Sequence, residues 1–351
     1  MKKIKYFTVL AFFYSNIFYT QNAKLYEVET IAFYNVENLF DTINDPSTFD
    51  DDRTPTGKDK WTKEKYLDKL NSIAKVISEI GIEVSKKPPA IIGLSEIENL
   101  QVLEDLISQP ALHAYNYGII QYNSPDRRGI DVALLFQKDL FTYTNSKTHE
   151  LLIYDNKNGK HRVYTRDQLV VSGFFKSEKM HFIVNHWPSR FGGKKKSSYK
   201  REAAASLNRK IVDSLFSLDP YAKIMTMGDF NDDPSDKSFM KILKTKTQKQ
   251  HLKFQDLYNP MATMARKGHG TSAYRDSWNF FDQIILTESF LNKDYSKFQF
   301  YKAEIFRKEY LFTKTGQYRG YPFRSYGYEG YTGGYSDHFP VLVYLIREVE
   351  K

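Results

Sequence analysis

The chain has 351 residues, of which 41% are hydrophobic and 26% charged, and its formal net charge is +9. This composition is typical of a soluble globular protein with either one large α/β domain or two ordinary ones. The lack of cysteine excludes a disulfide framework and a thiol-linked lipid anchor, so the core alone must stabilise the fold.

The N-terminus has the pattern of a secretory signal peptide. Lys2, Lys3 and Lys5 form a positive region, and the mostly apolar run that follows at residues 6–19 is short for a bilayer span. We therefore predict a signal peptide at residues 1–20 and a secreted or periplasmic mature protein; an uncleaved membrane anchor is the alternative. Cleavage removes three lysines and no acidic residue, which lowers the net charge from +9 to +6. A basic protein suits a polyanionic partner, although such a charge also serves solubility.

Hydrophobic periodicity predicts strands alternating with helices over the rest of the chain. Strands are expected at residues 30–36, 90–94, 117–122, 130–136, 169–171, 181–186, 222–227, 278–286 and 341–345. Helices are expected at residues 61–80 and 100–109 and from the end of a basic loop at 192–201 to about Phe216, and loops at 41–60 and 306–335. No internal repeat and no long linker divides this pattern, so we expect a single α/β domain at residues 21–351.

Polar residues stand at the ends or edges of these strands. Asp337 and His338 precede the strand at residues 341–345, and adjacent residues of an extended segment point apart, so the carboxylate can reach a metal while the imidazole reaches a water. An isolated Asp-His pair is more often a solvated turn. Here it belongs to an ordered set: Asn35, Glu96, Asp131, His186, Asp229, Asn231, Asp282, Asp337 and His338.

Physical chemistry suggests partners for several of these groups. Glu96 leaves the end of a buried strand, which is costly unless a cation receives it; an acid at a helix N-terminus is the alternative. Asp131 interrupts an apolar run and needs a partner such as a histidine. His186 precedes a run of cations, which favours a nearby anion, although a lone histidine at a strand end is usually structural. Asp229 and Asn231, two residues apart, should face the same side.

Six segments carry a family resemblance. They are Phe33-Tyr34-Asn35-Val36-Glu37-Asn38, Leu94-Ser95-Glu96, Arg128-Gly129-Ile130-Asp131-Val132-Ala133, Asn185-His186-Trp187-Pro188-Ser189-Arg190, Gly228-Asp229-Phe230-Asn231 and Ser336-Asp337-His338. In this order they resemble the endonuclease/exonuclease/phosphatase superfamily (deoxyribonuclease I-like), and most closely a secreted bacterial subgroup with the His-Trp-Pro-Ser-Arg and Gly-Gly loop. The match runs from about residue 29 to 346. It implies a four-layer α/β/β/α sandwich of two packed mixed β-sheets, with the active site at the sheet ends.

The resemblance also implies hydrolysis of a phosphoester by direct attack of water, assisted by a divalent cation, Mg²⁺ or Mn²⁺. The metal ligands that it implies are Asn35, Glu96 and Asp337. The catalytic residues are His186, Asp229, Asn231, Asp282, His338 and Asp131. Side chains expected to contact substrate phosphate are Arg166, Arg190, Lys195 and Arg201.

The resemblance implies a role for each catalytic residue. His338 orients or deprotonates the water and is held in the right tautomer by Asp282, while Asp229 lies near that water. Asn231 donates to a phosphate oxygen. His186, paired with Asp131, donates to the phosphate or protonates the leaving group; which histidine is the acid and which the base stays open.

Three classes of function remain. An endonuclease acting on nucleic acid is favoured by the positive charge and by the interleaved tyrosines and arginines of residues 318–328, which could stack bases and meet phosphates. A phosphatase or phosphodiesterase of small or lipid-linked phosphoesters shares the same core. A non-catalytic binding protein is disfavoured because the metal-site glutamate and both histidines are present. We expect a monomer with no stable protein partner and no membrane span after signal cleavage.

Overall fold

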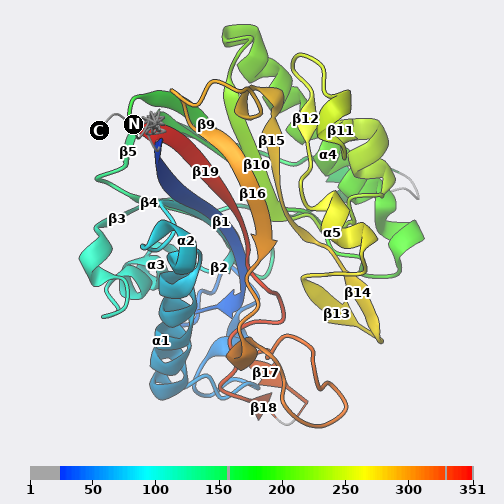
Figure 1. The fold of residues 1–351 in the computed structure, drawn as a ribbon. Coiled ribbons are helices and arrows are strands. Elements are labelled where there is room, and N and C mark those ends of the chain that lie inside the picture. Colours follow the sequence, from blue (N-terminus) through cyan, green and yellow to red (C-terminus); the bar gives the residue numbers. More distant parts are fainter. Residues whose placement is uncertain (1–23, 156–158, 329, 350–351) are drawn as a thin grey trace, which may run out of the picture.

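The computed structural model of the protein describes residues 24–155, 159–328 and 330–349 (Figure 1). The expected signal peptide at residues 1–20 lies outside these residues. Among the helices of the described ranges, none has both the length and the apolar character needed to cross a bilayer.

Two large β-sheets dominate the structure. In spatial order, the first sheet contains β16 (Gln299–Ile305), β19 (Val341–Val349), β1 (Leu25–Leu39), β2 (Ile91–Ile97), β4 (Asp131–Gln137) and β3 (Tyr117–Gln121). The second contains β11 (Thr245–Lys246), β12 (Leu257–Tyr258), β15 (Asp282–Thr287), β10 (Lys223–Asp229), β9 (Glu178–His186), β8 (Gln168–Phe175) and β5 (Phe141–His149). Both sheets mix parallel and antiparallel neighbours.

Helices and small hairpins complete the fold. The α-helices are α1 (Lys63–Glu79), α2 (Ile82–Ser85), α3 (Leu100–Ile107), α4 (Lys194–Leu218) and α5 (Ala262–Arg266), and a π-helix, η3, spans Ser238–Leu243. The two-stranded hairpins are β6 (Ile153–Tyr154) with β7 (Arg162–Val163), β13 (Ser272–Tyr274) with β14 (Ser277–Asn279), and β17 (Tyr326–Gly327) with β18 (Gly330–Tyr331). Single 3-10 turns lie at Asp51–Arg53, His113–Tyr115, Lys249–His251, Glu288–Phe290 and Glu309–Leu311.

Three buried clusters hold the layers together. Alternate residues of β1 serve different clusters: Ile31 and Phe33 pack between the two sheets, whereas Ala32 and Tyr34 pack under α1 and α3. A third cluster joins the outer face of the second sheet to α4 and η3. Figure 1 shows α1, α2 and α3 on one side of the paired sheets and α4 on the other. The predicted four-layer sandwich is therefore confirmed.

The strand directions gather one end of the sandwich around a single place. β1 runs parallel to β2, and β9 runs parallel to β10, so the C-terminal ends of these strands share an edge. β19 and β15 run antiparallel to β1 and β10, so their first residues lie at that same edge. Asp229 at the end of β10 consequently lies opposite Asp282 at the start of β15.

Some predicted boundaries are wrong. The basic loop expected at residues 192–201 is mostly helical, because α4 already begins at Lys194 after the glycine pair. The strand expected at residues 278–286 is interrupted: β14 ends at Asn279 and β15 begins at Asp282. The loop expected at residues 306–335 contains a 3-10 turn and the β17–β18 hairpin.

Candidate active site

Backbone irregularities aim two carboxylates at the shared edge. The pairing of β1 with β2 shifts between Asn35 and Leu39, and that of β2 with β4 shifts between Ser95 and Ile97. Within these bulges Glu37 has a φ of 52° and Glu96 a φ of 65°, in the left-handed region that side chains other than glycine rarely adopt. Such strain costs about 1–3 kcal/mol per residue and is found at functional sites, where it sets the direction of a side chain.

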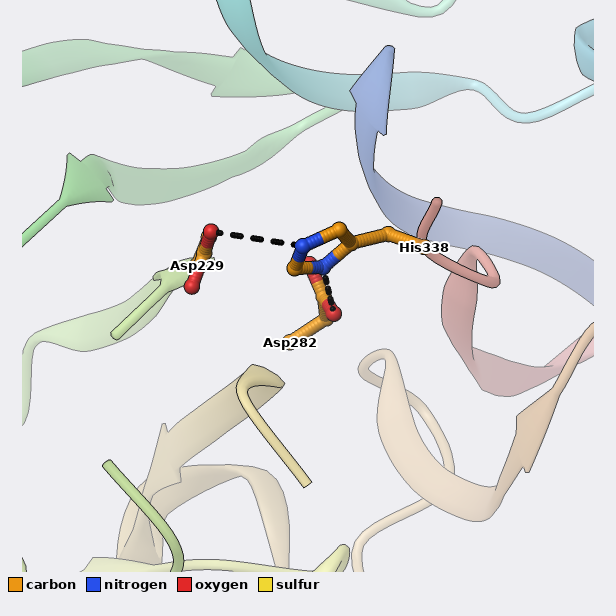
Figure 2. A group of neighbouring side chains, drawn as sticks. All are labelled: Asp229, Asp282 and His338. Atoms are coloured by element: carbon orange, nitrogen blue, oxygen red, sulfur yellow. Dashed lines mark hydrogen bonds and ion pairs between the residues drawn. The ribbon is translucent and has the colours of Figure 1, made fainter. Parts of the chain in front are cut away.

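A histidine–carboxylate pair forms the centre of the cluster (Figure 2). His338 Nδ1 lies 2.6 Å from Asp282 Oδ2, and His338 Nε2 faces Asp229 Oδ2 at 3.9 Å. Desolvation opposes charge on this imidazole, but the carboxylates of Asp282 and Asp229 outweigh it and raise the pKa of His338 well above its usual range. Asp282 thus fixes the proton on Nδ1 and leaves Nε2 facing the site.

His186 has the opposite electrostatic character. Its Nε2 lies 3.6 Å from Asp229 Oδ2 and 3.9 Å from Glu96 Oε1. Burial, together with the positive charges of Arg166 and Arg128, holds the pKa of His186 well below its usual range. One oxygen of Asp229 therefore faces a neutral imidazole and a charged one. Two titratable groups whose environments push their pKa values apart are the arrangement expected of an acid and base pair.

The predicted pairing of Asp131 with His186 is wrong. One oxygen of Asp131 accepts from the Ser124 backbone N–H at 2.9 Å, and the other accepts from Gln121 Nε2 at 3.1 Å. His186 Nδ1 is buried and has no hydrogen-bond partner among the described residues. Asp131 lies opposite Ile97 in the β2–β4 pair, and its hydrogen-bond donors come from the end of β3 and from the turn between β3 and β4.

Asn35 organises the acidic side chains. Its Nδ2 donates to Asp229 Oδ2 at 3.0 Å and to Glu96 Oε1 at 3.3 Å, while its Oδ1 accepts from the Glu37 backbone N–H at 2.9 Å. The Asn38 backbone N–H holds the second oxygen of Glu96 at 3.0 Å. In this arrangement Asn35 positions two carboxylates, and its oxygen is occupied by the bulge instead of facing them as the predicted metal ligand would.

The acidic groups fit a divalent cation. Burial raises the pKa of Asp229 to about 6, and desolvation with the carboxylates of Glu37 and Glu96 raises the pKa of Asp337 to about 7. These carboxylates gather where few cationic side chains balance them, and carboxylate oxygens are the ligands that Mg²⁺ and similar hard cations prefer. The predicted ligands Glu96 and Asp337 both belong to this acidic group, since the charge of Glu96 acts on the Asp337 carboxyl. A bound divalent cation polarises a phosphoryl oxygen and stabilises the leaving oxygen.

A second set of side chains also meets the spacing of a metal site. Ligand atoms of Asp229, Asp282 and His338 all lie within 4.8 Å of one another. The hydrogen bond between His338 Nδ1 and Asp282 Oδ2 already uses one atom from each of two members, so a cation bound there would have to displace a proton. We therefore interpret this set as a proton-handling group beside the metal ligands.

Asn231 occupies the turn after β10. With a φ of 51° its backbone N–H reaches Asp229 Oδ1 at 3.0 Å, and its Nδ2 donates to the Trp187 carbonyl at 3.1 Å. The prediction that residues 229 and 231 face the same side assumed an extended segment, and the left-handed conformation of Asn231 departs from that assumption. The amide joins the ends of β9 and β10 and lies at the rim of the cluster.

Two of the predicted phosphate-binding arginines are structural. Arg201 has no exposed surface; its Nε donates to Asp232 Oδ1 at 2.6 Å and its Nη atoms bind backbone carbonyls, which contradicts contact with substrate. Arg190 is joined to Asp233 at 2.8 Å and to Asp236 at 3.0 Å and packs on the Phe281 ring, so its charge is already paired.

Arg166 and Lys195 lie in different settings. Arg166 is buried beside the cluster, where it pairs with Asp126 at 2.9 Å and donates to the Trp187 carbonyl at 2.8 Å. Its charge still acts on His186. Lys195 is exposed on the first turn of α4, so among the four predicted cations it alone points to solvent.

Sequence reasoning missed a buried network behind Asp337. Lys69 of α1 donates to the Tyr335 carbonyl at 2.7 Å and to Ser325 Oγ. Glu37 accepts from the Ser325 backbone N–H at 2.6 Å and from its hydroxyl at 2.8 Å. The sequence did contain a sign of this network: Lys69 is a charged residue on the apolar stripe of α1, four residues before Ile73, where a buried lysine needs partners. The network fixes the segment that leads into Asp337 and His338.

Arg324 connects this network to the cluster. Its Nη2 donates to Asp337 Oδ2 at 3.2 Å and its Nε to Glu37 Oε1 at 3.4 Å. The side chain is half-exposed, in contrast to Arg201. A cation in this position neutralises part of the acidic cluster.

Comparison with known proteins agrees with this geometry. No curated protein sequence matches the chain significantly. Among solved structures, an endonuclease/exonuclease/phosphatase family protein from Bacteroides thetaiotaomicron is similar to it, with 16% identity, a TM-score of 0.55, and an alignment covering 94% of this chain and 98% of that one. A mannosyl-6-phosphatase from the same species has 17% identity and a TM-score of 0.53, with 90% and 99% covered.

A vertebrate structure is comparably similar. D. rerio TDP2, solved in complex with a single-strand DNA product, has 13% identity and a TM-score of 0.52, and the alignment covers 91% of this chain and 98% of that one. Identities this low show the shared fold alone. The sequence model of the Endonuclease/Exonuclease/phosphatase family, by contrast, matches residues 30–347, nearly the whole described chain. The chain therefore belongs to the endonuclease/exonuclease/phosphatase family of phosphoester hydrolases, which use divalent metal ions.

Proposed function

We propose that the protein is a secreted or periplasmic, Mg²⁺-dependent phosphodiesterase that cleaves nucleic acid as an endonuclease. Glu96 and Asp337 would hold the cation. His338, oriented by Asp282 and positively charged, positions the attacking water beside Asp229, whose carboxylate accepts the proton of the water, and neutral His186 donates a hydrogen bond to the phosphate or to the leaving oxygen.

The observation that carries the choice of a diester is the pair of hollows that flank the cluster. A cavity of about 1020 Å³ contains Asp337 in its wall, and another of about 530 Å³ contains Asp126 and Asp131. In the first sheet, β19 and β4 lie on either side of β1 and β2, so these two hollows begin on opposite sides of Asn35 and Glu96. A substrate whose phosphate lies in the cluster can therefore extend in both directions, as the two alcohol groups of a phosphodiester do.

Charge supports a polyanionic substrate. The mature chain keeps a net charge of +6 after loss of the three signal-peptide lysines, and Lys195 and Lys196 are exposed on the first turn of α4. That turn is joined to the strand-end loop after Asp229 through Arg201 and Asp232. Cations beside the active site contact the phosphates of a nucleic-acid backbone and strengthen binding without specifying sequence.

The test compares substrates with and without a second ester bond. Plasmid DNA, RNA, bis-p-nitrophenyl phosphate and p-nitrophenyl phosphate are incubated with the mature protein in Mg²⁺, Mn²⁺ or EDTA. We expect metal-dependent nicking and diester hydrolysis that disappear in EDTA and in His338→Ala, and persist in His251→Ala, a control histidine exposed outside the cluster.

Other results would redirect the assignment. Turnover of p-nitrophenyl phosphate alone would favour a phosphatase of small phosphoesters, and no turnover with any metal would favour a binding protein on this fold. Secretion is tested separately by mass spectrometry of the N-terminus in cell fractions: a chain in the cytoplasm that still begins at Met1 would contradict it.

A further inference from the structure

An aromatic cleft adjoins the candidate active site. It is the cavity of about 1020 Å³, and its walls are the β13–β14 hairpin on one side and the segment from Thr313 to Thr332 on the other. The Tyr321 hydroxyl joins the two walls, because it bonds both the backbone N–H and the carboxylate of Asp276 at 2.7 Å. In Figure 1 this hairpin lies next to the orange segment that carries β17 and β18. Arg324 and Asp337 at the inner end make the cleft continuous with the catalytic cluster.

The cleft presents aromatic rings to solvent. Tyr274 is 66% exposed, Tyr318 57%, and Tyr328 fully exposed, so burial in the core does not explain these residues. Exposed aromatic side chains gathered in one hollow mark a binding surface. Tyr318 lies 5.7 Å from Tyr321, measured between ring centroids.

The series of rings continues toward the catalytic histidine. Trp278 of β14 lies 6.1 Å from Tyr321 and stacks at 6.0 Å on Phe339, the residue that follows His338. A group stacked on the outer rings is therefore connected through packed side chains to Phe339 and so to the backbone of His338.

The charged groups of the cleft favour a ligand whose flat aromatic rings are linked by phosphates. Arg275 and Arg324 supply the positive charge. The carboxylates in the wall are already paired, Asp276 with the Tyr321 hydroxyl and Asp337 with Arg324. A nucleobase needs a flat apolar face, and the cations meet the phosphates that link one base to the next.

We propose that this cleft binds unpaired bases on one side of the scissile phosphate, so that the enzyme selects single-stranded over double-stranded nucleic acid. The inference rests on the proposed function, since it names the form of its substrate. Bases inside a duplex are stacked on one another and cannot offer their faces to tyrosine. The cleft volume is at the top of the ~300–1,000 Å³ range of pockets for drug-sized ligands, which suits a short run of nucleotides.

The test measures binding apart from cleavage. Fluorescein-labelled oligo(dT) and a labelled hairpin duplex are titrated by anisotropy with His338→Ala protein and with the same protein carrying Tyr318→Ala and Tyr328→Ala. We expect the tyrosine substitutions to weaken oligo(dT) binding by about 5- to 150-fold per lost stacking contact, and to leave duplex binding nearly unchanged. The matched control is Tyr221→Ala, a tyrosine 74% exposed near the start of β10, at the opposite end of that strand from Asp229.

A kinetic arm checks that the site itself is intact. With His338 in place, the two tyrosine substitutions should leave hydrolysis of bis-p-nitrophenyl phosphate unchanged, because its single aryl group on that side of the phosphate fills only the inner end of the cleft, at Arg324 and Asp337, and does not reach the exposed outer tyrosines. Equal oligo(dT) affinity in the tyrosine and Tyr221 variants, or equal affinity of the protein for oligo(dT) and duplex, would overturn the inference. Displacement of the fluorescein-labelled oligo(dT) by hexose 6-phosphate as readily as by unlabelled oligo(dT) would overturn it too.

The inference and the proposed function fail in different ways. Cleavage of duplex DNA that is indifferent to both tyrosines refutes the cleft assignment and leaves the nuclease standing. Tyrosine-dependent binding of oligo(dT) without cleavage of any nucleic acid refutes the nuclease and leaves the cleft as a binding site.

Discussion

Asp131→Asn separates a structural from a catalytic role for this carboxylate. Burial raises the pKa of Asp131 from 3.8 to about 7. At about 1.36 kcal/mol per pKa unit, holding the charged form in the fold at pH 8 costs about 4 kcal/mol. The cost vanishes below pH 4, where the group is protonated in both the folded and the unfolded chain. Wild-type stability therefore falls, relative to the neutral variant, as the pH rises from 4 through 7.

The assay is urea unfolding of both proteins at pH 4.5 and pH 8. Subtracting wild type from variant removes the contribution of every other titrating group, and we expect the variant to gain about 3 kcal/mol between the two conditions, because about 1 kcal/mol of the cost is already present at pH 4.5. Hydrolysis of bis-p-nitrophenyl phosphate at pH 8 should be nearly unchanged, because Asp131 makes no hydrogen bond to His186. An equal stability difference at both pH values would refute the burial reasoning. A fall in kcat of about 100-fold or more would restore the Asp131–His186 pair.

Three further outcomes are expected. Asp282→Asn should lower kcat by about 10²- to 10⁴-fold with little change in KM, because it removes the group that fixes the His338 proton; retained activity toward bis-p-nitrophenyl phosphate would contradict the dyad. Lys69→Met removes two hydrogen bonds to the segment before Asp337, so limited proteolysis should cut residues 312–335 faster and kcat should fall; an unchanged cleavage rate would argue against the anchoring role. Burial lowers the pKa of His181 to about 4, so wild type should lose about 3 kcal/mol relative to His181→Gln as the pH falls from 6.5 to 4, measured by urea unfolding; a pH-independent difference would sink this assignment.

The long interior strands and the edge strand β3 could be predicted from the sequence, whereas the edge strands β5 and β16 could not. β1 and β10 are buried on both faces and read as apolar runs. β5 and β16 lie at the edges of the two sheets, where β5 is largely exposed and carries mostly polar residues between Phe141 and His149. An edge strand has one neighbour and less to bury, so its sequence lacks the apolar pattern on which the prediction depends.

The position of arginines in the sequence was a poor guide to which of them lie at the candidate active site. Arg190 and Arg201 follow His186 closely in sequence and were expected to meet phosphate, but carboxylates of the turn after β10 claim both of them. Those carboxylates come from residues 232–236, more than thirty positions away. Arg324, far from His186 in sequence, is the arginine that reaches the acidic cluster.

The sequence by itself determined which residues stand at the ends of buried strands, because a polar side chain directly after an apolar run can lie only where the sheet meets solvent or a cation. That rule found Glu96, Asp229 and His338 without any coordinates. The resemblance implied Asp282 as the partner of His338, and the structure has that hydrogen bond. Only the tertiary structure decided the other partners: Ser124 in place of His186 for Asp131, and Asn35 between Glu96 and Asp229. Hydrogen bonds depend on distances of a few tenths of an ångström between strands remote in sequence, and those distances exist only once both sheets have packed.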